Sequence, residues 1–210
     1  MNQELLQKQK IIVVDFLSRG NFTEMIGSLT KNETDVLRLL ILHHEAIAIR
    51  TIRNFIVFNL GMKNKSTLLK ANKISILEMP EGGIKEKTRY LANLANTISD
   101  PKKLKVLLVF APDSTLISQG IPPMSLTEKI DTLESVLKDS GVSVPSWDAI
   151  KNAVDNLVYL TLIQRKQSKK SEWAYEVSPV VYKLWREELE RVSGRSNRTD
   201  AELRSFLFSF

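Results

Sequence analysis

Residues 144–191 constrain the fold more than any other part of the chain, because helical and strand patterns alternate within them. Five apolar residues recur there at helical spacing: Trp147, Ile150, Val154, Leu157 and Val158. This spacing predicts an amphipathic helix over residues 146–159. Two short strands are predicted next, at residues 160–165 and 173–177, joined by the basic turn KQSKKS at residues 166–171. Ser178-Pro179 then begins a second helix.

The remaining chain predicts a mostly α-helical protein. Thr30-Lys31-Asn32-Glu33 and Ser125-Leu126-Thr127-Glu128 are two capping boxes, and each predicts the start of a helix. Residues 65–77 fit either a third helix or a helix that runs into a strand. Pro80-Glu81-Gly82-Gly83 could form the tip of a hairpin, but the apolar spacing beyond it favours a connecting helix over residues 85–97.

We expect three parts in the chain. Residues 1–98 form a basic helical module, residues 99–192 form three helices with a β-hairpin, and residues 193–210 form a linker and a C-terminal docking segment. The segment SDPKKLKVLLVF begins the second module, with Pro101 in the first turn of its helix.

Two of these segments carry a family resemblance. SDPKKLKVLLVF resembles the opening helix of ArsR-type repressors, and LTKNETDVLRLLIL, beginning at Leu29, resembles the Leu-Thr-x-x-Glu-x-x-Val-Leu start of MarR-type regulators. Both groups belong to the winged helix-turn-helix superfamily. The resemblance implies a DNA-binding winged helix in residues 99–192 and a degenerate second one in residues 1–98. Such a tandem pair is also similar to certain replication initiators. The cysteines that bind metal in ArsR-type repressors are absent.

Charge is distributed unevenly along the chain. Residues 46–77 contain no acidic residue, and their cations alone equal the net charge of +6: Arg50, Arg53, Lys63, Lys65, Lys70 and Lys73. A solvated helix face normally mixes both signs, so this segregation favours a phosphate-binding surface over ordinary solvated lysines.

The predicted hairpin supplies a second basic group. Its cations would contact the DNA backbone as a wing: Arg165, Lys166, Lys169 and Lys170. The alternative is a charged hairpin tip that only keeps the protein soluble.

The helix before the hairpin has a mixed outward face. Asn152 and Asn156, with Lys151 beside them, are the base-reading candidates, because an asparagine amide can pair with an adenine edge. Asp148 and Asp155 on the same face would repel phosphates and instead favour a protein interface. Trp147, Trp173 and Trp185 all fall at positions predicted to be buried, which favours packing over base stacking.

Catalytic signatures are absent from the sequence. It contains no Gly-x-Gly-x-x-Gly, no Gly-Lys-Ser/Thr and no Gly-x-Ser-x-Gly, and its only histidines are the adjacent His43 and His44. We therefore expect no enzymatic activity, no cofactor and no metal.

The function expected from these features is double-stranded DNA binding by a transcription regulator or a replication or chromatin accessory factor. The protein is expected to be cytoplasmic, associated with the nucleoid and not inserted in a membrane. Terminal helices predict a homodimer, and the tail with Phe206, Phe208 and Phe210 predicts docking onto the body or a partner. The rival function is a protein-interaction scaffold that docks a partner through the winged helix.

Overall fold

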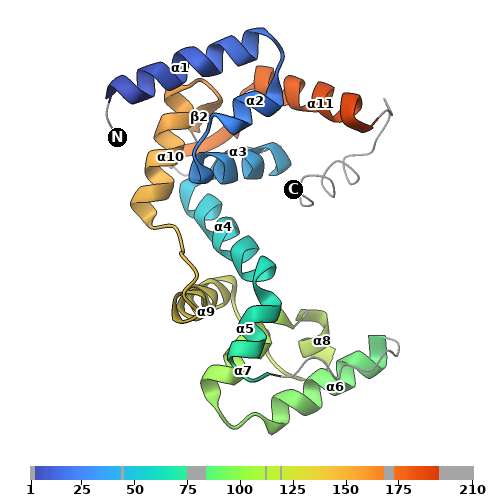
Figure 1. The fold of residues 1–210 in the computed structure, drawn as a ribbon. Coiled ribbons are helices and arrows are strands. Elements are labelled where there is room, and N and C mark those ends of the chain that lie inside the picture. Colours follow the sequence, from blue (N-terminus) through green and yellow to red (C-terminus); the bar gives the residue numbers. More distant parts are fainter. Residues whose placement is uncertain are drawn as a thin grey trace. The chain divides into compact units, whose positions relative to one another are not determined.

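A computed structural model describes residues 3–43, 45–74, 84–111, 113–118, 120–167 and 173–193. In this part of the chain, helices predominate and three short strands form one antiparallel sheet (Figure 1). The prediction of a mostly α-helical protein is confirmed. The Pro80–Gly83 turn and most of the C-terminal tail lie outside the described residues.

The chain divides into two compact units. The first comprises Met1–Ile56 and Pro145–Phe210, and the second comprises Val57–Val144. Helix α4 (Ile49–Lys63) contributes residues to each unit. This division differs from the boundaries expected after residues 98 and 192, because one unit is made from both ends of the chain. Helices α7 (Pro101–Phe110) and α9 (Leu126–Asp139), expected beside the hairpin, belong to the second unit.

The first unit contains the sheet. Its remaining elements, in chain order, are α1 (Gln3–Ser18), α2 (Phe22–Gly27), α3 (Lys31–His43), β1 (Ile47–Ala48), α10 (Trp147–Tyr159), β2 (Ile163–Gln167), β3 (Trp173–Val177) and α11 (Pro179–Ser193). The capping box predicted for α3 is present: Thr30 N donates to Glu33 Oε2 at 2.8 Å, and Glu33 N donates to Thr30 Oγ1 at 3.4 Å. Ser146 caps α10 by a single bond, in which its Oγ accepts from the Ala149 N–H at 3.1 Å.

The hairpin pairs with a strand from the first quarter of the chain. The strand order is β1-β3-β2, so β3 lies between its hairpin partner and β1, with Ile47 opposite Tyr175. Strand β2 begins at Ile163 and not at residue 160, which corrects the prediction. Thr161 adopts a left-handed conformation with φ of 61° directly after α10, and a turn with this φ cannot continue an extended strand.

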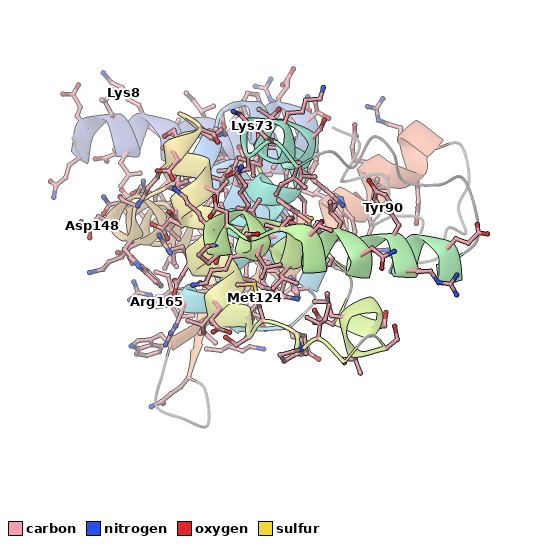
Figure 2. All side chains as sticks on the ribbon, turned by 90° about the horizontal axis from the view of Figure 1, so that it is seen from below. Lys8, Lys73, Tyr90, Met124, Asp148 and Arg165 are labelled. Carbon is pink, nitrogen blue, oxygen red and sulfur yellow. The ribbon has the colours of Figure 1, made fainter. Side chains whose placement is uncertain are left out.

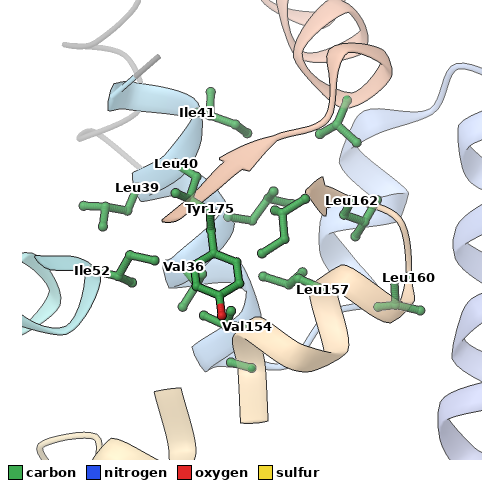
Figure 3. Close-up of a cluster of buried hydrophobic side chains, with 14 of the residues drawn as sticks. Val36, Leu39, Leu40, Ile41, Ile52, Val154, Leu157, Leu160, Leu162 and Tyr175 are labelled. Carbon is green, nitrogen blue, oxygen red and sulfur yellow. The ribbon is translucent and has the colours of Figure 1, made fainter. Parts of the chain in front are cut away.

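The core of the first unit joins residues from distant parts of the sequence. Figure 3 shows Val36 and Leu40 of α3 and Val154 and Leu157 of α10 packed around Tyr175 of β3. All are buried, and the cluster also includes side chains from the first half of α4. Helix α4 is therefore anchored in the same core as α3 and α10.

The second unit is helical throughout its described residues. Besides the second part of α4 with α7 and α9, it contains α5 (Lys65–Ala71), α6 (Ile84–Thr97) and α8 (Asp113–Ser118). The helix expected over residues 85–97 is confirmed as α6. The core contains Leu68, Leu107 and Leu133, all nearly inaccessible to solvent. Helix α7 packs against α5 and α9 in this core.

Candidate nucleic-acid interface

Several cations of the acid-free segment are exposed and unneutralised. Arg50 lies near the start of α4, in the first unit, whereas Lys63, Lys70 and Lys73 lie at the end of α4 and around α5, in the second. All four are exposed, and none forms an ion pair within the described residues. The three lysines therefore remain available to a polyanion, and Arg50 is available separately.

Hydroxyl groups accompany these lysines. Ser66 and Thr67 are both exposed, four and three residues before Lys70, which is the spacing of one helix face. We call Lys63, Ser66, Thr67, Lys70 and Lys73 the α5 surface. Hydroxyls and lysines are both common phosphate ligands in DNA complexes. Charge pattern alone did not identify the two hydroxyl residues, although their spacing from Lys70 could have done so.

Lys73 and Lys65 differ in their settings. Lys73 has φ of 55°, and its N–H donates to the Lys70 carbonyl at 2.9 Å, so it lies in the turn that ends α5. Lys65 is only partly exposed, and its Nζ lies 5.7 Å from the centre of the Phe110 ring. Lys65 is therefore engaged within the unit, while Lys73 extends the α5 surface.

Arg53 is not at the surface. Its side chain is buried, with 6% of the residue exposed, and its guanidinium carbon lies 4.8 Å from the centre of the Trp147 ring. This is cation–π geometry. The expectation that Arg53 anchors phosphate is not met, because α4 turns this residue towards α10 while it turns Arg50 towards solvent.

Arg165 and Lys166 of the hairpin have acidic neighbours. Arg165 forms an ion pair with Asp155 at 2.7 Å, and Lys166 forms one with Glu176 at 2.7 Å. Both cations stay partly exposed, so they can exchange partners but are not free charges. Lys169 and Lys170 lie outside the described residues.

Helix α10 presents only part of the predicted base-reading set. Lys151 and Asn152 are exposed, as is Asp148 near the start of the helix. Figure 2 labels Asp148 of α10 and Arg165 of the hairpin. Asn156 is instead held at the helix flank, where its Nδ2 donates to Glu33 Oε1 at 2.9 Å. The amide of Asn156 therefore joins two helices, and its predicted base-reading role stays a prediction.

Two tryptophans are exposed against expectation. Trp147 is 45% and Trp173 is 55% exposed, whereas Trp185 is buried as predicted. Trp147 is the first residue of α10 and Trp173 the first of β3. Residues at the ends of elements lie at the margin of a core, and periodicity alone cannot report this. The first unit consequently has indole rings at its surface.

The described residues contain no group of three or more histidine, aspartate or glutamate side chains that could hold a metal ion. No helix in this part of the chain combines the length and apolar character needed to cross a lipid bilayer. Comparison with known proteins adds no assignment, because no family model, no curated protein and no solved structure matches the chain.

Proposed function

We propose that this protein binds double-stranded DNA without catalysing a reaction, and that the α5 surface makes its main phosphate contacts. The observation that carries the proposal is the exposure of Lys63, Lys70 and Lys73 without ion pairs in the described residues, in a segment free of acidic residues. Cations without local partners lose little on binding phosphate, and they release the counterions that drive association. The role would be that of a transcription regulator or a replication or chromatin accessory factor.

We further propose that the first unit is a winged helix into which the second unit is inserted. Helices α3, α4 and α10 share one core, β1 follows the first of them, and the hairpin follows the last. The strand order β1-β3-β2 brings β1 against the hairpin, as this topology requires. The MarR-like segment then forms the first helix of the winged helix, and residues 57–144 separate the second helix from the third.

In this arrangement, α10 and the hairpin are secondary contacts. Lys151 and Asn152 are exposed on α10, but Asp148 on the same helix opposes a phosphate backbone. Arg165 and Lys166 must exchange their carboxylate partners, Asp155 of α10 and Glu176 of β3, for phosphates before they contribute. We therefore assign most of the affinity to the α5 surface and to Arg50.

A salt titration tests the proposal. Duplex binding is measured by fluorescence anisotropy over a range of salt concentrations, for the natural chain and for Lys63→Gln/Lys70→Gln/Lys73→Gln. Each lost phosphate contact lowers the slope of log K against log salt by about 0.9. The triple variant should therefore bind more weakly, with a slope smaller by up to about 2.7.

A matched control removes the same charge elsewhere. Lys102, Lys138 and Lys183 are exposed lysines that already have carboxylate partners, so their triple glutamine variant loses three charges outside the α5 surface. It should keep the natural slope. If both triple variants lost the same affinity and slope, the effect would come from net charge and not from the α5 surface. If the natural chain did not bind duplex DNA, the proposal would be overturned.

A second function is favoured by one observation, the exposure of Trp147 and Trp173 on a unit in which Arg165 and Lys166 are already paired. Exposed indole rings are typical of protein interfaces. The rival proposal is therefore a scaffold that docks a protein partner through the first unit. Trp147→Ser/Trp173→Ser should abolish capture of that partner at high salt, and it should leave duplex binding by the α5 surface unchanged.

A further inference from the structure

Helix α1 has apolar side chains on more of its circumference than one core contact requires. Val13 is fully buried, yet Leu5, Ile11, Ile12 and Val14 are all exposed, with Ile11 at 67%. In Figure 1, α1 runs along the outside of the first unit, with α2 and α10 on the same side of it. A helix with apolar residues nearly all round is usually covered on more than one side.

Charged residues frame the exposed isoleucines in an ordered way. Glu4, Lys8, Ile11 and Asp15 follow spacings of four, three and four residues, and Arg19 follows four residues later, so they share the outward face. Lys8 pairs with Glu4 at 2.9 Å and Arg19 pairs with Asp15 at 3.0 Å. The Arg19 N–H also donates to the Asp15 carbonyl, which places Arg19 on the same helical turn.

The charges on this face are complementary to those of a second copy of α1 that runs in the opposite direction. Lys8 lies three residues before Ile11, and Asp15 lies three residues after Ile12. Glu4 and Arg19 lie seven residues before and after the same pair. Two antiparallel copies related by an axis between Ile11 and Ile12 therefore place Lys8 opposite Asp15 and Glu4 opposite Arg19. A parallel pair would instead place like charges together.

We propose that α1 is a homodimerisation helix, which packs antiparallel against α1 of a second copy of this chain. A two-fold interface must match itself, and this face does so in both its apolar centre and its charges. Ile11 and Ile12 supply the apolar contact at the axis. The Glu4–Lys8 pair of each copy lies opposite the Asp15–Arg19 pair of the other copy, so the interface contains two groups of four charges. This inference is independent of the proposed DNA binding, and its test contains no nucleic acid.

The first test is the mass of the full chain in solution, measured by sedimentation over a range of concentrations. The natural protein should be a dimer, and Ile11→Asn/Ile12→Asn should be a folded monomer with an unchanged circular dichroism spectrum. Lys8→Glu alone and Asp15→Lys alone each place two like-charge pairs across the axis, and each should weaken dimerisation by about tenfold. Lys183→Glu, which reverses a similarly exposed and paired lysine on α11, should have no effect.

Mixing the two single variants gives the decisive result. In a heterodimer of Lys8→Glu with Asp15→Lys, both cross-axis contacts between these positions again join opposite charges. The mixture should therefore recover natural dimerisation, although both variants have lost an intrahelical ion pair. A monomeric natural chain, or a mixture no better than its components, would overturn the proposal. So would a dimer that depends on residues 194–210 and not on Ile11 and Ile12.

Discussion

Asn156 Nδ2 donates a hydrogen bond to Glu33 Oε1 across 2.9 Å, although 123 residues separate the two in sequence. Glu33 is fully buried, and its other carboxyl oxygen accepts from Thr30 N at 2.8 Å and from Gln9 Nε2 at 3.1 Å. One carboxyl group therefore connects α1, the start of α3 and α10. A buried carboxyl group is stable only when donors surround it, so the four residues depend on one another.

Replacing Asn156 should destabilise the protein without affecting exposed contacts. Asn156→Ala removes a donor from a buried oxygen, which should lower the free energy of unfolding by about 1–3 kcal/mol. Urea denaturation measures this loss. Asn152→Ala, on the exposed side of the same helix, should change stability by less than about 0.5 kcal/mol. Equal effects of the two substitutions would show that the Glu33 contact contributes little.

Local sequence signals were sufficient for α10 but not for its assembly with other helices. Ser146 and the spacing of Ile150, Val154 and Leu157 predicted α10 almost to the residue, because capping and amphipathic spacing are local. The partner of that helix was not predictable. Periodicity shows that an apolar face must be buried, but not that it meets α3 across an intervening 88-residue unit.

The site was predictable in part, for the same reason. The absence of acidic residues from 46–77 is visible in the sequence, and Lys63 and Lys70 of this segment are exposed in the structure, while their phosphate binding stays a prediction. Arg53 differs from Arg50 only in the direction in which α4 presents it. The carboxylate partners of the hairpin cations depend on cross-strand register and on the position of α10, neither of which a single sequence reveals.

Arg53 should behave as a structural residue. Arg53→Met keeps an apolar stem but removes the cation over Trp147, and cation–π contacts contribute about 0.5–2 kcal/mol. We expect a lower free energy of unfolding by roughly this amount and an unchanged salt slope for duplex binding. A double-mutant cycle with Trp147→Leu should give a coupling energy of the same size. A smaller salt slope with unchanged stability would instead restore Arg53 as a phosphate contact.

Acid should weaken the contact between α11 and α2. Hydrogen bonds from Arg191, and to a lesser extent from Thr23, lower the pKa of Glu188 below its ordinary value of 4.5. A lowered folded-state pKa stabilises the protein above pH 4.5, and this stabilisation is lost as the pH falls through the lowered value. Glu188→Gln should therefore show a smaller decrease in stability below pH 4.5 than the natural chain, measured by urea denaturation at several pH values.

The same contact provides the control for the pH experiment. Arg191→Met removes the largest cause of the lowered pKa and should also reduce the acid sensitivity. Combined with Glu188→Gln, it should add no further change in pH dependence. If Arg191→Met reduced the acid sensitivity again in that background, the proton would be bound by another group.

Gly61 should not tolerate a side chain. A Cβ atom at this position of α4 would lie 2.6 Å from Cδ2 of Leu133, which is itself 1% exposed on α9. The gain in helix propensity, about 1 kcal/mol, is smaller than the cost of overpacking, which is about 1–3 kcal/mol. Gly61→Ala should therefore lower the melting temperature, and Gly61→Ala/Leu133→Val should recover part of the loss. Gly27→Ala, with nothing within 4 Å of its added carbon, should have no destabilising effect.

Asp155 of α10 and Glu176 of β3 should compete with DNA for Arg165 and Lys166. Asp155→Asn/Glu176→Gln removes both ion partners, and exposed pairs of this kind contribute only about 0.2–1 kcal/mol to stability. The freed cations should strengthen duplex binding and steepen the dependence of log K on log salt by up to about 1.8. Fluorescence anisotropy across salt concentrations measures both quantities.

A control must separate this competition from the added net charge. Asp139→Asn/Glu187→Gln removes the ion partners of Lys102 on α7 and Lys183 on α11, neither of which belongs to the hairpin. If the hairpin contacts the backbone, only the Asp155/Glu176 variant should steepen the salt dependence. Identical slopes for the two variants would exclude Arg165 and Lys166 as phosphate contacts, because long-range attraction acts on both variants alike.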